Sequence, residues 1–339
     1  MITPGLVDIQ VNGFAGVDFN DAGLTPEALD DALEAMLASG VTTCLPTIIT
    51  ATPTELEARF AALDHSIAGS RLGPLMCPGY HLEGPFLNPM SGYSGCHPAS
   101  AMTAADPGLV LSLEKVLTRP ILLITLAPEV EGGLDFIKAM VTQDRLVSIG
   151  HSSIDFAGVG KAVAAGAQLS THLGNGLPQV LPKLANPLFA QLAEDRLLAT
   201  FIADGIHLPP PALKALIRAK GFERSALVTD ATAAAAARPG DYDFAGMRIH
   251  RSADGSVGLP GLKGLAGSAL RLDDAIRNLV HWRIATFEQA VQMASTRLLD
   301  VLEPVLRARS IALPEAEIEW SDTMALKRIR LGNKERTFN

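Results

Sequence analysis

Short runs of apolar and β-branched residues alternate along the chain with segments in which apolar residues recur at helical spacing. The runs predict strands over residues 6–10, 41–46, 75–82, 121–127, 146–150, 167–172, 198–203 and 225–230. The helical spacing predicts helices over residues 26–38, 54–67, 107–117, 134–142, 156–165, 210–219, 268–281 and 286–299. Strands that alternate with helices pair in parallel through right-handed crossovers, and eight of them close a barrel. We therefore expect an α/β fold, a (β/α)8 TIM-like barrel, over residues 1–300.

The pattern changes after about residue 303, where alternation is weak and most of the late charge is found. We expect residues 301–339 to form a C-terminal appendage, either a few antiparallel strands or a loose tail.

Composition and charge limit the classes of partner and the compartment that we expect for the protein. Of the 339 residues 19% are charged, the formal net charge is -8, and no basic run occurs. This argues against nucleic acid and anionic membranes as partners. Three cysteines without paired spacing favour a reducing compartment. A secretory signal and an apolar run of about 20 residues are both missing, so a cytoplasmic protein is expected.

Polar side chains follow the predicted strands at their C-terminal ends, where parallel barrels carry their active sites. In chain order they are Gln10, Asn12, Glu83, His151, His172, Asp204, His207 and Asp230. Each one alone is compatible with a structural role, such as a loop cap. Together, Glu83, His151 and His172 match the ligand set of a catalytic zinc site, which keeps one position open for water. The neutral amides of Gln10 and Asn12 are poor ligands, which favours a single metal ion.

With these residues the chain resembles the N-acetylglucosamine-6-phosphate deacetylase family of the amidohydrolase superfamily. The matching segments are PGLVDIQVNGFAGVDFND (4–21), HLEGPFLN (81–88), IGHSS (149–153), THLGNGLP (171–178), IADGIHL (202–208), LVTDA (227–231) and LAGSAL (265–270). They run in order to about residue 299, and HLEGPF and the Q-x-N-G opening are the most specific.

The resemblance implies that Glu83, His151 and His172 bind one divalent metal and that Asp230 is the catalytic acid/base. Zinc is favoured, with iron, cobalt or manganese as alternatives. The implied substrate contacts are Gln10, Asn12, Cys96, His97, Asn175, Gly176, Asp204, His207, Leu265, Ala266 and Gly267. His97 or His207 would donate a hydrogen bond to the oxyanion of the attacked amide.

The chain departs from the family pattern at its N-terminus and at a predicted phosphate-binding position. The chain starts three residues before the PG motif, so the small β-sandwich of the family is expected to be reduced or absent. Lys183 stands where the family's phosphate-binding arginine is expected, presented to the neighbouring subunit, which implies a homodimer. Lysine offers a point charge without the bidentate fork of arginine. An ordinary loop lysine is the alternative.

The sequence thus predicts a deacetylase that hydrolyses the acetamide of N-acetylglucosamine 6-phosphate, or of a close N-acetyl amino sugar. Two alternatives stay open at this point. One is an amidohydrolase for a different amide, without phosphate, and the other is a barrel that has lost activity and serves as a binding protein.

Overall fold

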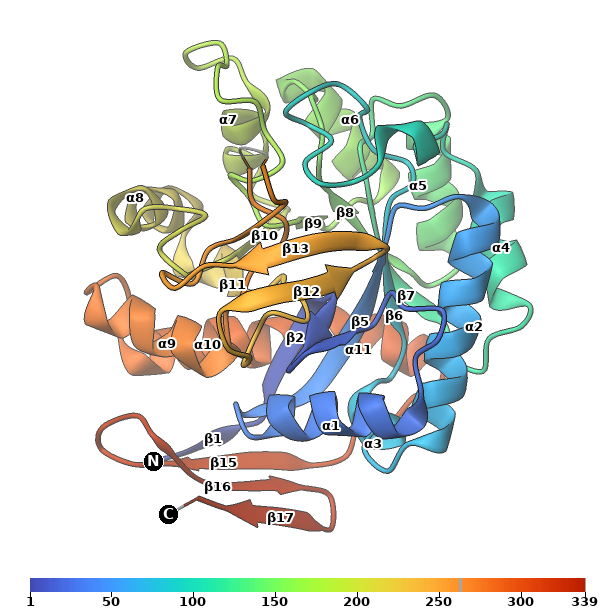
Figure 1. Ribbon diagram of the computed structural model, residues 1–339. Helices are drawn as coiled ribbons and strands as arrows, with labels where there is room; N and C mark the ends of the chain where they lie inside the picture. The colour runs from blue at the N-terminus through green and yellow to red at the C-terminus, as the bar shows by residue number, and fades with distance from the viewer. Residues whose placement is uncertain (262–263, 339) are drawn as a thin grey trace.

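The computed structural model describes residues 1–261 and 264–338. Its central sheet has eight parallel strands in the spatial order β11-β10-β9-β8-β7-β6-β5-β2. They are β2 (Leu6–Val11), β5 (Val41–Ile49), β6 (Tyr80–Glu83), β7 (Ile121–Leu126), β8 (Leu146–Ile149), β9 (Leu169–Ser170), β10 (Leu198–Phe201) and β11 (Ser225–Leu227). The edges meet, because Val11 bridges Ala231 in parallel and the Asp230 amide donates to the Gln10 carbonyl at 2.9 Å. The sheet is a nearly closed (β/α)8 barrel, as the sequence predicts (Figure 1).

Helices surround the barrel. They are α1 (Pro26–Leu37), α2 (Pro53–Gly69), α3 (Gly73–Met76), α4 (Pro107–Glu114), α5 (Gly133–Thr142), α6 (Phe156–Ala165), α7 (Pro187–Leu192), α8 (Pro210–Lys220), α9 (Leu272–His281), α10 (Phe287–Ala294) and α11 (Thr296–Ala308), with the 3₁₀ turns Ala99–Ala101 and Phe222–Arg224. The start of α1 follows its sequence signals: Thr25 accepts from the Ala28 amide, and a proline takes the first helical position. Among the described helices, none combines the length and the apolar character needed to cross a membrane.

Two predicted elements differ from the structure in kind, and others differ only in where they begin or end. Residues 75 and 76, assigned to a strand, belong to the short helix α3, which has a proline in its first turn. The helix predicted over 286–299 is two helices, because the backbone breaks at Ser295 (φ -143, ψ -89). The second of them, α11, continues to Ala308 and so crosses residue 300, where the sequence predicts a domain boundary.

A small antiparallel sheet follows β11. Its strands are β12 (Gly240–Phe244), β13 (Met247–Arg251) and β14 (Val257–Gly258). The turn between β12 and β13 is held to the barrel, because Asp18 accepts from the Ala245 amide at 2.6 Å and Arg59 donates to the Ala245 carbonyl at 3.1 Å. Asp18 belongs to a two-stranded ribbon, β3 (Gly13–Phe14) and β4 (Val17–Asp18), that directly follows the first barrel strand.

Both ends of the chain lie in a four-stranded sheet beside the barrel (Figure 1). Its order is β1 (Ile2–Pro4), β15 (Ala316–Trp320), β16 (Leu326–Leu331) and β17 (Lys334–Thr337). Ile318 and Ile329 are buried and belong to the same apolar core as the barrel. The tail beyond α11 is therefore an ordered sheet that takes its first strand from the other end of the chain.

Candidate functional site

A cavity of about 590 Å³ opens at the C-terminal ends of the barrel strands. Most of the sequence-predicted site residues line it: Asn12, Glu83, Cys96, His97, His151, His172, Asn175, Gly176, His207, Asp230, Leu265 and Gly267. Three more lie directly behind the wall. Gln10 donates to Glu83 at 3.1 Å, Asp204 binds His207, and Ala266 is fully buried.

Lys183 differs from the other predicted residues. It lies in the exposed loop before α7 and is not part of the cavity wall. Val180 and Leu184 in the same loop are 86% and 67% exposed, so the loop presents two apolar side chains at the surface. Within one chain, the structure therefore does not bring Lys183 into the site.

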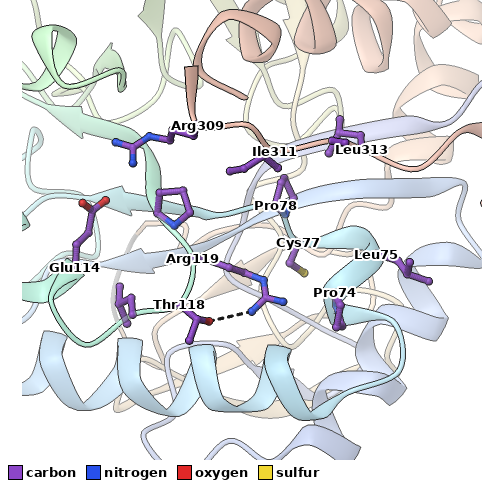
Figure 2. Close-up of a pocket in the computed structure, with 13 residues that line it drawn as sticks. Pro74, Leu75, Cys77, Pro78, Glu114, Thr118, Arg119, Arg309, Ile311 and Leu313 are labelled. Carbon is purple, nitrogen blue, oxygen red and sulfur yellow. Dashed lines mark hydrogen bonds between the residues drawn. The ribbon is translucent and has the colours of Figure 1, made fainter. Parts of the chain in front are cut away.

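A second cavity, of about 550 Å³, lies at the opposite end of the barrel. Figure 2 shows residues that line it. It is bordered by the segments that precede β6 and β7 and by the segment after α11, with Arg119 donating to Thr118 at 3.2 Å. Because catalytic groups of parallel barrels gather at the C-terminal strand ends, the first cavity is the candidate site.

Glu83 is the centre of the site. Its carboxylate is fully buried, and oxygen Oε1 lies 3.1 Å from His172 Nε2 and 3.5 Å from His151 Nε2. Its other oxygen lies 3.9 Å from His97 Nε2. Burial opposes ionisation, but hydrogen bonds from His151 and His172 and the charge of His172 outweigh it and hold the pKa of Glu83 well below its usual value. One anionic carboxylate thus faces three imidazoles.

The backbone that presents these groups is unusual. His151, His172 and Asp230 have φ values of 53°, 31° and 49°, in the left-handed region that non-glycine residues rarely adopt. All three come directly after barrel strands. Such conformations persist only where the surroundings fix them, and they concentrate at functional sites.

His151 is oriented from behind. Its Nδ1 lies 2.7 Å from the Tyr93 carbonyl, which can only accept, so Nδ1 carries a hydrogen and Nε2 faces Glu83. Glu129 holds the following residues, because it accepts from the Ser152 hydroxyl and from the Ser153 amide, both at 2.6 Å. This support resembles the outer hydrogen bonds that orient histidine ligands of metals.

The donor set fits a divalent cation. Ligand atoms of Glu83, His97 and His151 lie within 4.8 Å of one another, and His172 contacts the same carboxylate. Nδ1 of His172 is buried and has no hydrogen-bond partner among the described residues. A buried nitrogen without a partner is costly unless something else satisfies that ring. Carboxylate and imidazole ligands suit zinc and other transition metals.

Asp230 stands beside this cluster as a carboxyl that resists ionisation. Burial, and after it the charge of Glu83, raises the pKa of Asp230 to about 6. Asn12 opposes the shift by donating from Nδ2 to Asp230 at 2.8 Å. A carboxyl with a pKa near neutrality is suited to taking up and releasing a proton.

His207 completes the opposite wall. Its Nδ1 lies 2.6 Å from Asp204. The hydrogen bond with His207 and the charge of His207 outweigh the effect of burial and lower the pKa of Asp204. On the Glu83 side, burial and the neighbouring His151 lower the pKa of His97 to about 3, so that ring is neutral. Either ring can offer an N–H to a substrate oxygen.

Some residues of the site were missed by sequence reasoning. Tyr93 and Thr50 form hydrogen bonds with the predicted histidines, and Glu129 holds the serines that follow His151. Phe244 and Gln179 line the cavity. Glu129 could have been predicted as a site residue, because it lies just after the fourth predicted strand. Tyr93 acts through its backbone carbonyl, which side-chain chemistry cannot reveal. Phe244 lies in the β12–β14 sheet, which was not predicted.

Known proteins resemble the chain along most of its length. It is 32% identical over 323 residues to the N-acetylgalactosamine-6-phosphate deacetylase of Escherichia coli, covering 92% of this chain and 83% of that protein. It is also 32% identical over 311 residues to the N-acetylglucosamine-6-phosphate deacetylase of Caenorhabditis elegans, covering 87% and 72%. A scan of family models finds no match.

Solved structures agree with these relatives. The N-acetylglucosamine-6-phosphate deacetylase of Mycobacterium smegmatis, solved as an Asp-to-Ala variant in complex with N-acetyl-D-glucosamine-6-phosphate, is 25% identical. The match has a TM-score of 0.84 and covers 98% of this chain and 86% of that one. The enzyme of the same name from Pasteurella multocida gives a TM-score of 0.86 at 24% identity, covering 99% and 86%, which supports the fold.

Proposed function

The chain belongs to the N-acetylglucosamine-6-phosphate deacetylase family, and from that premise we propose that it hydrolyses the acetamide of N-acetylglucosamine 6-phosphate. The products are acetate and the amino sugar phosphate. The observation that carries the proposal is the Glu83 carboxylate in contact with imidazoles beside Asp230. That arrangement is a hydrolytic centre, and the family relation supplies the substrate.

Glu83, His151 and His172 would hold one divalent cation, with zinc as the proposed metal. When bound, such an ion supplies Lewis acidity, which polarises an amide carbonyl and makes water nucleophilic at neutral pH. The fit rests on the buried, partnerless Nδ1 of His172 and on the orientation of His151 by the Tyr93 carbonyl.

Asp230 would move the proton. In its ionised form it accepts a proton from the water that attacks the acetamide carbonyl, and it then donates that proton to the departing amine. The hydrogen bond from Asn12 holds the carboxylate in place during both transfers. His97 and His207, on opposite sides of the cavity, are positioned to donate to the oxygen on which charge develops.

The phosphate end of the substrate is assigned to Lys183 of a second copy of the chain. Within one chain Lys183 lies outside the cavity wall, on a loop with exposed Val180 and Leu184. The same loop reaches the site through Gln179, which lines the cavity. We therefore propose a homodimer in which this apolar loop is buried and brings Lys183 near the neighbouring site.

The test is acetate release by the purified protein supplied with zinc. N-acetylglucosamine 6-phosphate should be hydrolysed, and Asp230→Asn should lower kcat by roughly a thousandfold without unfolding the protein. Turnover of N-acetylglucosamine but not of its 6-phosphate would reject the phosphate assignment alone. Hydrolysis restricted to N-acetyl amino acids or cyclic amides would reject the sugar.

The 4-epimer is a second candidate substrate. Two relatives at 32% identity, from Escherichia coli and a Shewanella strain, are N-acetylgalactosamine-6-phosphate deacetylases. The relatives named N-acetylglucosamine-6-phosphate deacetylases are 29–32% identical to the chain, so family membership does not select between the two sugars. Comparing kcat/KM for the two phosphates measures the preference directly.

A further inference from the structure

One buried carboxylate has no part in the proposed hydrolysis. Asp8 lies in β2, two residues before Gln10, and its side chain is fully buried. Oxygen Oδ1 accepts from the backbone amides of Gln10 and Thr229, both at 3.3 Å. Oxygen Oδ2 accepts from the Thr229 hydroxyl at 2.5 Å. Asp8 therefore joins the first barrel strand to the end of the eighth.

Thr229 connects Asp8 to the residues around Asp230 through further hydrogen bonds. Its hydroxyl oxygen, while donating to Asp8, accepts from the Ala231 amide at 3.1 Å. Its carbonyl accepts from the Ser268 hydroxyl at 2.6 Å. The residues on both sides of Asp230 are thus fixed by hydrogen bonds that begin at Asp8 or at Ser268.

Asp230 needs such support. Its φ of 49° lies in the left-handed region, which is unfavourable for a residue with a side chain and is retained only where neighbours impose it. Released from its neighbours, the turn would relax toward an ordinary conformation and would swing the carboxylate away from Asn12.

We propose that Asp8 is a positioning residue for Asp230, acting through the Thr229 hydroxyl. The inference rests on the proposed role of Asp230 as acid/base. A displacement of about 1 Å at a catalytic group lowers turnover by roughly a hundredfold. The hydrogen bonds from Asp8 through Thr229, which we call the clamp, are therefore expected to control kcat. Among the proposed substrate contacts Asp8 touches only Gln10, through the backbone amide, so we expect KM to change little.

The chemistry of the site explains why a carboxylate stands at this position. All three partners of Asp8 are donors, two amides and one hydroxyl. The ionised form of Asp8, which prevails above about pH 7, only accepts and so matches all three. An asparagine would turn an N–H toward one of them and break the match. The titratable groups that influence Asp8 or respond to it are Asp230 and Cys44, and neither is a cation.

The decisive experiment is the kinetic and structural comparison of Asp8→Asn with the native enzyme, both loaded with zinc. We expect kcat to fall by roughly tenfold to a hundredfold while KM changes by less than about twofold. Thr229→Val, which removes the hydroxyl, should reproduce the loss, and Thr229→Ser, which restores it, should recover most of kcat.

Asp64→Asn is the matched control for lost stability. Asp64 is a buried carboxylate that accepts from the Tyr80 and Thr118 hydroxyls and lies outside the cavity wall. It should lower the melting temperature as Asp8→Asn does but leave kcat unchanged. Equal kcat in Asp8→Asn and Asp64→Asn would overturn the proposal.

A crystal structure of metal-free Asp8→Asn separates this inference from the proposed function. The contact between Asn12 and Asp230 should be lost or lengthened, whatever substrate the enzyme uses. An unchanged turn at Asp230 would overturn the positioning role even if the native protein hydrolyses the sugar phosphate. Conversely, a displaced turn in a protein inactive on sugar phosphates would support the clamp and reject the substrate.

Discussion

Asn12 and Asp230, 218 residues apart in the sequence, meet through a hydrogen bond of 2.8 Å from the amide nitrogen to the carboxylate. The contact lies where the first and last barrel strands join, beside the backbone bond from the Asn12 amide to the Ala231 carbonyl at 2.7 Å. Because the side-chain nitrogen of Asn12 donates to Asp230, its side-chain oxygen is available to accept a hydrogen bond. Its Oδ1 is buried without a partner among the described residues and borders the cavity. A substrate N–H or O–H would satisfy it.

The first prediction concerns Asn12→Leu, which keeps the size of the side chain and removes the donor. The hydrogen bond from Asn12 lowers the pKa of Asp230, so its loss should raise that pKa above about 6. Asp230 must be ionised to act as a base in the free enzyme, so kcat/KM should fall off at a higher pH than in the native enzyme. Activity measured across the acid range tests this. A lower kcat/KM with its acid limb unmoved would restrict Asn12 to substrate binding.

The second prediction separates metal ligands from substrate contacts. Chelation should abolish activity, and added zinc should restore it. His151→Ala and His172→Ala should lose the metal, because each removes one proposed ligand. His97→Ala should keep about one metal per chain yet lose most of kcat, since His97 is the ring farthest from Glu83, at 3.9 Å. Metal content by mass spectrometry decides, and loss of metal from His97→Ala would move His97 into the ligand set.

The third prediction addresses phosphate recognition. Lys183→Ala should raise KM for the sugar 6-phosphate by roughly tenfold and leave the unphosphorylated sugar unaffected, because only the phosphate needs a cation. Lys183→Arg should restore or improve binding through its bidentate fork. Lys138→Ala is the control, since Lys138 is an exposed lysine on the outer helix α5. A monomeric enzyme with unchanged KM in Lys183→Ala would reject the shared site.

The barrel was predictable because buried parallel strands are continuous apolar runs. β7 (Ile121–Leu126) is such a run, with all six residues buried. The site followed from the same rule, since polar residues that end these runs converge at one rim. The strand that this rule predicts over residues 167–172 is longer than the observed one. Only Leu169–Ser170 forms ladder pairs there, because the chain turns into the site at His172.

The remaining sheets have no comparable signal. In β12 (Gly240–Phe244), half-buried residues alternate with exposed charged ones, and the strand is recognisable only through its pairing with β13. β1 pairs with β15, so the first residues of the chain lie against residues more than 300 positions away. Local periodicity cannot report contacts of that range. The clamp at Asp8 was hidden for the same reason, because its partner Thr229 lies 221 residues away.

The fourth prediction is a dependence of stability on pH that originates in Asp8. Burial raises the pKa of Asp8 from 3.8 to about 7, against the lowering effect of its hydrogen bonds. Between about pH 4 and pH 7 the folded protein therefore keeps a proton at Asp8 that the unfolded chain has released. Stability from this group must fall as pH rises through that window, and it stays constant above it.

The shift corresponds to at most about 4 kcal/mol of unfolding free energy. Asp8→Asn cannot titrate, so its stability relative to the native enzyme should improve progressively from about pH 4 to about pH 7. Urea denaturation of both proteins across this range measures the difference. A difference that stays constant with pH would mean that Asp8 is ionised in the folded protein at all these values. The clamp would then act with a permanent charge, stabilised by its three donors rather than opposed by burial.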